Sequence, residues 1–164
     1  MSQQGEVTGP LPVVSWLKLP ADGEPYLEGH TCGGCGAVYL GSRENCSRCG
    51  ARGKMAATRL SSKGKLYSYS IVYRSYPGVE VPYISAIVDL EGGGTVKGNL
   101  IHVEPDPDKV AFDMPVEVVF QDALGRVDEE GNHYISYFFQ PAEDHSTRAG
   151  RVANPARDPE TKTT

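Results

Sequence analysis

Apolar and polar residues alternate along most of the central and C-terminal part of the chain. Alternation of this kind is typical of β-strands with one buried face, because successive side chains of a strand point to opposite sides of a sheet. In one such stretch, Ile84, Ala86, Val88 and Leu90 would share a face. The pattern predicts five short strands separated by glycine, proline and aspartate turns: residues 66–73, 83–90, 95–102, 115–122 and 133–141.

The number and spacing of these strands suggest a barrel. One short helical turn, residues 104–113, is expected between the third and fourth strands. Five strands with a short insertion at this point are typical of the OB fold, a small closed barrel. A meander that packs against a partner is the competing architecture. We therefore predict a mainly β chain with a five-stranded OB-fold domain over residues 64–142.

The stretch 29–53 lacks this alternation and holds all four cysteines as two C-x-x-C-G motifs: Cys32, Cys35, Cys46 and Cys49. Each motif makes a turn that directs both sulfurs to one centre, and the glycine after it suits a left-handed backbone. Four thiolates with no open position are typical of structural zinc, although iron accepts the same ligands. We predict a rubredoxin-like zinc ribbon that depends on its metal, because so short a segment has little apolar surface to bury.

The remaining segments differ in composition from both units. Residues 1–28 are predicted to form an N-terminal arm that contains the only tryptophan, Trp16. Residues 54–63 are predicted to link the ribbon to the barrel. Residues 143–164 contain few apolar side chains, so we expect a flexible tail that is disordered or docks on a partner.

Large aromatic residues concentrate in the first and last predicted strands. Alternation places Tyr67, Tyr69 and Tyr73 on one face of the first strand, with Leu66 on the other. A small barrel does not need so many large groups inside, and exposed apolar clusters mark subunit interfaces. The tryptophan is expected to pack on the ribbon or on another subunit. The candidate interface residues are Trp16, Tyr67, Tyr69, Tyr73 and Phe138.

The net charge and the distribution of reactive groups argue against several classes of function. The 164 residues include 21 acidic and 16 basic ones, for a net charge of −5, which disfavours general nucleic-acid binding. No apolar run reaches the length of about 18 residues that a membrane helix needs, and residues 1–10 have neither the basic start nor the apolar core of a signal peptide, so we expect a cytoplasmic protein. The histidine spacing suggests no catalytic triad, and every cysteine is used in the predicted metal site, so we expect no catalysis by this chain alone.

The order of these features resembles one family across residues 26–142. The cysteine stretch is followed by "GKLYSYSIVYRSYPG", "VPYISAIVDLEGGGTVKGNLI", "DKVAFDMPVEVVF" and "ISYFFQPA". This order is similar to that of the rubredoxin-like zinc-ribbon plus OB-fold family of acyl-CoA-associated proteins, long catalogued as a domain of unknown function. Two places depart from it. Gly41 and Ser42 precede Arg43 where the family usually has two prolines, and Asp113 stands where it usually has glycine.

The resemblance implies an accessory role in acyl-CoA chemistry. Members accompany thiolase-superfamily enzymes, and their OB domain lies beside the CoA channel of the partner. This chain would be a required, non-catalytic subunit for thiolysis of a β-ketoacyl-CoA, for example of the benzoylsuccinyl-CoA type. The implied partner is a thiolase-fold subunit in a heterotetramer with two copies of each chain, and that partner would bind most of the CoA thioester. The candidate CoA contacts of this chain are Lys65, Arg74 and Lys97.

Two alternatives stay open at this point. The resemblance also allows a thiolase-like steroid side-chain aldolase or a hydroxymethylglutaryl-CoA synthase assembly as the partner. From a different class, zinc ribbons and OB barrels often bind nucleic acid, and the tyrosines of the first strand would suit base stacking. The acidic composition counts against this second alternative.

Overall fold

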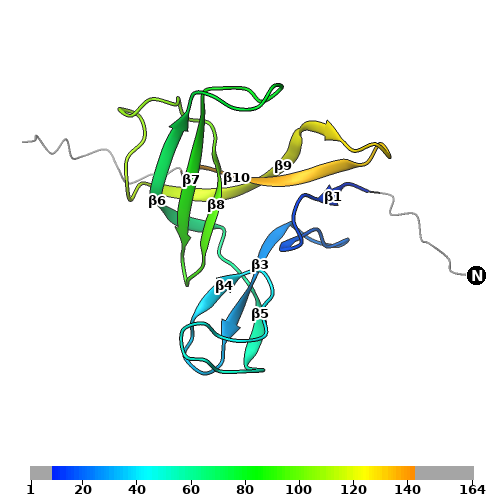
Figure 1. Ribbon diagram of the computed structural model, residues 1–164, viewed down its shortest axis with the longest axis vertical. Helices are drawn as coiled ribbons and strands as arrows, with labels where there is room; N and C mark the ends of the chain where they lie inside the picture. The colour runs from blue at the N-terminus through cyan, green and yellow to red at the C-terminus, as the bar shows by residue number, and fades with distance from the viewer. Residues whose placement is uncertain (1–8, 143–164) are drawn as a thin grey trace, which may run out of the picture.

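The computed structural model of the chain describes residues 9–142, which contain ten β-strands in two units (Figure 1). One unit is a six-stranded sheet that curves into a barrel, and the other is a small sheet beside the cysteines, at the bottom of Figure 1. The predicted mainly β architecture of a ribbon followed by a barrel is confirmed. The predicted tail, residues 143–164, lies outside the described residues.

The barrel strands are β6 (Lys63–Val72), β7 (Tyr83–Leu90), β8 (Thr95–Leu100), β9 (Pro115–Val127) and β10 (His133–Pro141). The first three form an antiparallel meander, and β9 returns to pair with β6. β10 pairs antiparallel with β9 and parallel with β8, which closes the barrel. The closed pairing is that of an OB fold and excludes the open meander.

Alternation predicted the core face of β7 correctly. Ile84, Ala86, Val88 and Leu90 are all buried, and Phe139 of β10 is fully buried in the same cluster. Because these side chains come from neighbouring strands, their burial holds the barrel closed without any help from the cysteines.

A β-bulge in β6 changes the predicted faces of its aromatic residues. Pairing with β7 shifts register between Leu66 and Ser68, so Tyr67 lies in the bulge and is 65% exposed. The extra residue brings Leu66 and Tyr69 to the same side of the strand, where both contribute to the core. Tyr69 is therefore half-buried, with its ring centroid 5.4 Å from that of Phe112. The expectation that its side chain is fully exposed is wrong, while its contact with a partner stays a prediction.

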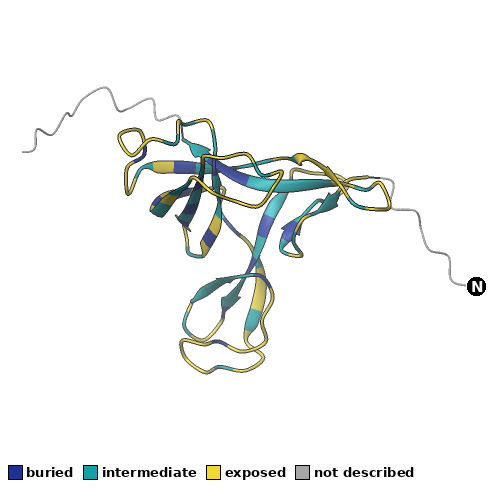
Figure 2. Cartoon of the chain, turned by 45° about the horizontal axis from the view of Figure 1, so that its top comes forward, coloured by how far each residue is buried: buried dark blue, intermediate teal, exposed yellow. Residues whose placement is uncertain are grey.

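The ribbon sheet is formed by β2 (Leu17–Lys18), β3 (Tyr26–Cys32), β4 (Val38–Leu40) and β5 (Met55–Arg59). Its bounds differ from the prediction, since β3 begins before residue 29 and β5 occupies half of the predicted linker, residues 54–63. β5 pairs with β3 from Met55 to Arg59, which satisfies backbone groups along an edge of β3 that would otherwise be unpaired. Residues 60–62 then connect the two units. Figure 2 shows that the loops at the far end of the ribbon are mostly exposed.

The N-terminal arm contacts both units. β1 (Leu11–Pro12) pairs parallel with β10, next to a hydrogen bond of 3.0 Å from the Val13 amide to the Ile135 carbonyl. Trp16 is half-buried, packs against the core cluster, and lies against Gly41 of the ribbon. It therefore packs on the ribbon, one of the two places that the sequence suggested, and helps to fix the ribbon to the barrel.

Residues 104–113 form turns and not the predicted helical turn. Two prolines in this segment lack a backbone N–H, and the Asp106 carboxylate accepts a hydrogen bond of 2.8 Å from the Asp108 amide, which closes a side-chain turn instead. Asp113 at its end has a φ of 62°. Glycine adopts this left-handed conformation most easily and aspartate tolerates it, which accounts for aspartate where the resembling family has glycine.

The second departure from the family pattern also has a backbone cause. Gly41 has a φ of 72°, and its amide donates a hydrogen bond of 3.1 Å to the Glu28 carbonyl. Proline can neither adopt this φ nor donate a hydrogen bond. The Gly41 backbone therefore accounts for the absence of proline at this position in the chain.

Candidate metal centre and partner surface

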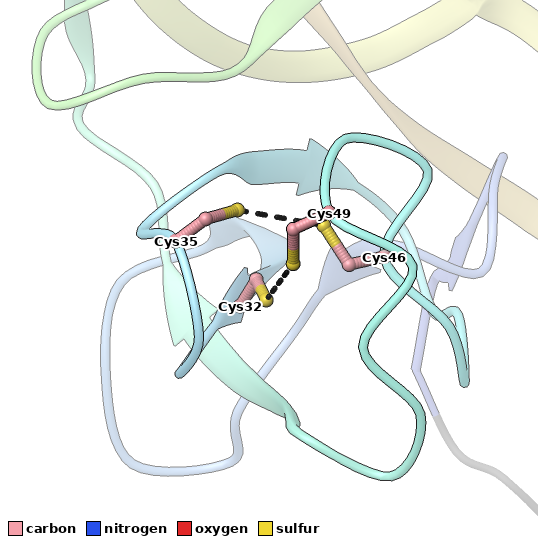
Figure 3. A group of neighbouring side chains, drawn as sticks. All are labelled: Cys32, Cys35, Cys46 and Cys49. Carbon is pink, nitrogen blue, oxygen red and sulfur yellow. Dashed lines mark hydrogen bonds between the residues drawn. The ribbon is translucent and has the colours of Figure 1, made fainter.

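Two equivalent turns bring the four cysteines together. In one, the Gly36 amide donates to the Cys32 carbonyl at 2.8 Å, and in the other the Gly50 amide donates to the Cys46 carbonyl at 2.9 Å. Gly36 and Gly50 have φ values of 71° and 72°, the left-handed conformation that the C-x-x-C-G motif predicts. The sulfurs project from two facing loops toward one point (Figure 3).

The four sulfur atoms have the spacing of a tetrahedral site. All lie within 4.8 Å of one another, with 3.7 Å between the sulfurs of Cys32 and Cys49 and 3.6 Å between those of Cys35 and Cys46. A tetrahedral ion with metal–sulfur bonds of about 2.3 Å places its sulfurs about 3.8 Å apart. A disulfide would require about 2.0 Å, and the cysteines are free. The cluster can hold a metal ion, and its all-thiolate donor set suits zinc or iron.

The Cys46 sulfur has the richest hydrogen-bonding environment of the four. The Tyr39 hydroxyl lies 3.4 Å from it. This hydroxyl, followed by the backbone amides of Cys49 and Arg48, lowers the pKa of Cys46 to about 6. Tyr39 belongs to β4, and cysteine spacing alone could not identify it, because it reaches the sulfur across the ribbon and not from the motif itself.

The other cysteines differ in environment and exposure. The Gly34 amide donates to the Cys32 sulfur at 3.3 Å. The Ala37 amide lowers the pKa of Cys35, but burial and the neighbouring thiols outweigh it and raise the pKa to about 11. Cys32 and Cys46 are buried, whereas Cys49 is exposed. Solvent therefore reaches the cluster from the Cys49 side.

The described histidines lie outside this cluster. Among residues 9–142, the four cysteines are the only group of three or more potential metal ligands. His102 Nδ1 lies 2.8 Å from the Gln140 side-chain oxygen, and His30 Nδ1 is buried without a hydrogen-bond partner in the described part of the chain. No helix in that part is long and apolar enough to cross a membrane.

The three candidate CoA contacts do not all converge. Lys65, Arg74 and Lys97 are exposed. Pairing with β7 places Lys65 opposite Asp89 and Lys97 opposite Ile87, so both lysines lie on the outer face of the meander. Arg74 follows the opposite end of β6 from Lys65, so roughly 25 Å of strand separates these two residues. Lys65 and Lys97 therefore share a face, and Arg74 lies too far from Lys65 for one phosphate group to meet all three residues.

An open groove of about 780 Å³ runs between the β6–β7 loop and the β9–β10 hairpin. Apolar side chains from five different segments line it, among them Val13, Tyr83, Leu124 and Phe138. Phe138 lines this groove and is only 5% exposed, so the expectation that its side chain is exposed is wrong, while its contact with a partner stays a prediction. Tyr73, in contrast, is 63% exposed, as expected for a residue at an interface.

Several exposed apolar residues were not predicted. Tyr76 in the β6–β7 loop is 84% exposed, and Leu124 in the hairpin is 67% exposed. β9 extends to Val127, beyond its predicted end at residue 122, because pairing with β10 resumes at Val127 after an irregular stretch, residues 123–126, opposite Tyr134. The Asp122 carboxylate accepts a hydrogen bond from the Gly125 amide inside this stretch. Charged and glycine residues there interrupt the alternation, so the pattern ended the strand too early.

Comparison with known proteins places the chain in a family. The family model described as ChsH2, C-terminal OB-fold domain, matches residues 57–121. The chain is 36% identical over 123 residues to a DUF35 domain-containing scaffold protein of Methanocaldococcus jannaschii, covering 72% of this chain and 83% of that protein. It is 35% identical over 127 residues to benzoylsuccinyl-CoA thiolase subunit BbsA of Geobacter metallireducens, covering 76% of this chain and 81% of that subunit.

A solved structure supports the same assignment. The Ltp2-ChsH2(DUF35) aldolase is similar with a TM-score of 0.55 and 26% identity, over 71% of this chain and 84% of that one. Since identities above one third also extend over most of the relatives' lengths, the chain belongs to the DUF35 family of OB-fold proteins.

Proposed function

We propose that this chain is a zinc-binding, non-catalytic accessory subunit of a thiolase-superfamily enzyme that acts on acyl-CoA thioesters. The observation that carries the proposal is the 35% identity to a benzoylsuccinyl-CoA thiolase subunit over 76% of the chain. The relatives named as scaffold proteins support a role in assembly. The reaction that we assign to the complex is cleavage of a β-ketoacyl-CoA by CoA.

The position of the thiols supports a non-catalytic role for this chain and a catalytic role for its partner. Thiolysis needs a nucleophilic cysteine to take the acyl group and donors that stabilise the tetrahedral intermediate. All four cysteines of this chain lie in one cluster with metal-site spacing, and as metal ligands they would not serve as nucleophiles. We therefore assign the acyl-accepting cysteine to the partner. This chain would form one wall of the substrate channel, exclude water from it and position the thioester.

The cluster itself would serve the structure of the subunit. A closed set of four thiolates leaves no coordination position for a substrate, so bound zinc would stabilise the ribbon and take no part in thiolysis. Zinc is our choice over iron for this role, and elemental analysis with the absorption spectrum separates the two.

We place the contact with the partner on the exposed tyrosines of β6 and of the loop that follows it. Tyr67 and Tyr73 are 65% and 63% exposed, and Tyr76 in the loop is 84% exposed. Exposed groups of this size usually mark an interface. A symmetric thiolase dimer offers two equivalent docking sites, which supports a heterotetramer with two copies of each chain.

CoA would contact this chain through its phosphates. The outer face that carries both Lys65 and Lys97 offers two cations to one diphosphate, and Arg74 offers a separate site near the groove. Replacing each with alanine distinguishes these sites. A rise in KM for the CoA thioester with unchanged assembly identifies the contact, and unchanged KM in all three variants rejects direct CoA binding by this chain.

An aldolase is the second candidate for the partner. The observation that favours it is the likeness to the Ltp2-ChsH2(DUF35) aldolase, at 26% identity and a TM-score of 0.55. The scaffold role of this chain would be the same, and only the bond cleaved by the partner would differ.

Reconstitution tests the proposal. A candidate thiolase-fold subunit is expressed with and without this chain, and cleavage of a β-ketoacyl-CoA is measured with CoA as co-substrate. We expect co-elution and activity that requires both chains, and we expect Tyr73→Ala to weaken assembly while Lys54→Ala, at the exposed end of the ribbon, does not. Full activity of the thiolase alone, without complex formation, rejects the proposal. Retro-aldol cleavage without thiolysis identifies the second candidate.

A further inference from the structure

We infer that Tyr39 is a positioning residue of the metal centre, which donates a hydrogen bond to the Cys46 sulfur and is itself held by Arg43 and the Arg48 backbone. The inference rests on the metal site of the proposed function and extends it beyond the four cysteines. It concerns how firmly the ribbon holds its metal and how Cys46 is protected.

The direction of the hydrogen bond follows from the neighbours of the hydroxyl. The Arg48 amide donates to the Tyr39 oxygen at 3.1 Å, so that oxygen already acts as an acceptor. The single hydroxyl proton is then free for the Cys46 sulfur, which lies 3.4 Å away. A metal-bound thiolate has no proton to donate, so the bond can only run from the tyrosine to the sulfur.

Arg43 strengthens this arrangement. Its guanidinium carbon lies 4.0 Å from the centroid of the Tyr39 ring, and its Nη1 donates to the Ser47 hydroxyl at 3.3 Å. A cation over the ring draws electron density from the phenol and makes its hydroxyl a better donor. A divalent ion with four thiolates carries an excess of negative charge, which the same guanidinium offsets. Arg43 thereby links the loop before Cys46 to the turn that follows it.

The contacts make the four ligands unequal. Cys46 is 2% exposed and receives the tyrosine hydroxyl, whereas Cys49, on the same turn, is exposed. A hydrogen bond to a thiolate lowers its tendency to take up a proton or to react with an electrophile. Cys46 is therefore a protected ligand of the centre, whereas alkylating reagents reach the centre first at the exposed Cys49.

The test compares two tyrosine variants of the full chain. Tyr39→Phe removes only the hydroxyl and keeps the ring under Arg43. The matched control is Tyr26→Phe, because the Tyr26 ring also faces a guanidinium, that of Arg59 at 4.9 Å. Tyr26 starts β3 and Cys32 ends it, so roughly 20 Å of strand separates this control from the sulfurs.

Two readouts distinguish positioning from a general loss of stability. Zinc affinity is measured by chelator competition, and the thiolate-to-metal charge-transfer band is recorded with cobalt(II). Loss of an outer-shell partner typically weakens metal binding by about 10–100-fold, and we expect about tenfold for Tyr39→Phe. The cobalt band should move to lower energy, because a sulfur without its hydrogen bond donates electrons more readily. Tyr26→Phe should change neither quantity.

The outcomes separate this inference from the metal proposal. Metal-free wild-type protein overturns both. Stoichiometric metal in the wild type, with equal affinity and an unshifted band in both tyrosine variants, overturns the inference alone. If Tyr39→Phe binds no metal at all, Arg43→Gln decides, since it leaves the hydroxyl in place. If Arg43→Gln binds zinc more weakly than the wild type and its cobalt band also moves to lower energy, the inference is supported. If Arg43→Gln has the zinc affinity and the cobalt band of the wild type, the inference is overturned.

Discussion

The ribbon and the barrel differ in how much apolar surface they bury. Among residues 33–54, all of which the structure describes, Cys46 is the only buried hydrophobic side chain. In the barrel, alternating residues of neighbouring strands form one apolar cluster around Phe139, which is fully buried. The contrast is visible in Figure 2, where the far end of the ribbon is largely exposed and the barrel strands carry buried positions.

The barrel and the end of the ribbon therefore depend on different sources of folding free energy. The barrel is stabilised by removing apolar surface from water, so it does not need a ligand. The end of the ribbon has almost no such surface, so the free energy of metal binding must supply its folding. Leu17 and Leu27, from strands of the ribbon sheet, lie in the same apolar cluster as the barrel residues, so only the cysteine end of the ribbon lacks such support. We therefore expect a change at that end to disturb the barrel little.

Removal of one sulfur should have the largest effect, and only on the ribbon. We expect Cys46→Ser to abolish stoichiometric metal binding and to unfold the cysteine loops, because structural zinc contributes about 10–16 kcal/mol in small zinc-binding peptides. Elemental analysis measures the metal, and amide NMR spectra report the two units separately. Ser42→Ala, an exposed change in the same loop, is the control. Simultaneous loss of the barrel signals would contradict independent stabilisation.

A cavity in the barrel should have the next largest effect. Phe139→Ala removes a fully buried ring and is expected to lower the free energy of unfolding by about 3–5 kcal/mol. Phe112→Ala is the matched control: its side chain is 64% exposed and loses only its contact with the Tyr69 ring, so we expect about 1 kcal/mol. Urea denaturation measures both. Comparable losses in the two variants would show that the apolar cluster is not what holds the barrel.

A backbone position in the barrel offers a smaller test. Asp113 has a φ of 62°, which a β-branched residue adopts only with strain. We expect Asp113→Val to lower the free energy of unfolding by about 1–2 kcal/mol and Asp113→Gly to leave it equal or slightly higher. Urea denaturation again provides the values, with the metal content unchanged in both. A valine variant as stable as the wild type would show that the turn can change its conformation freely.

The regular parts of both units could be predicted from the sequence, and the irregular parts could not. Period-two alternation identified the core face of β7, and cysteine spacing identified the sulfur cluster, because both patterns depend on local geometry. The bulge at Tyr67 and β5 depend on pairing with distant strands, so no local pattern marks them. Tyr39 was missed for the same reason: its partner, Cys46, belongs to another loop of the ribbon.

The tip of the β9–β10 hairpin differs from both units, because neither an apolar core nor the cysteine cluster supports it. The Asp128 carboxylate accepts hydrogen bonds from the Glu130 and Asn132 amides at 3.0 and 2.9 Å. It also accepts bonds of 2.9 Å from the Asn132 side chain and from the Tyr134 hydroxyl. The Asn132 side chain and amide are the main causes that lower the pKa of Asp128 to about 2.

The smallest predicted effect is therefore a pH dependence confined to this tip. Because the pKa of Asp128 is lower in the folded chain than its usual value of 3.8, its contribution is complete above about pH 4 and is lost as the pH falls toward 2. The Glu130 and Asn132 amide resonances should titrate together with a midpoint near that value. Asp128→Asn should remove this titration and speed amide exchange at the tip at neutral pH, whereas Glu129→Gln, which removes a neighbouring exposed charge, should preserve both. Acid also protonates the thiolates, so the ribbon resonances must be followed separately. A midpoint near 4 in the wild type would mean that the carboxylate contributes nothing to the tip, and that its backbone turn suffices to hold it.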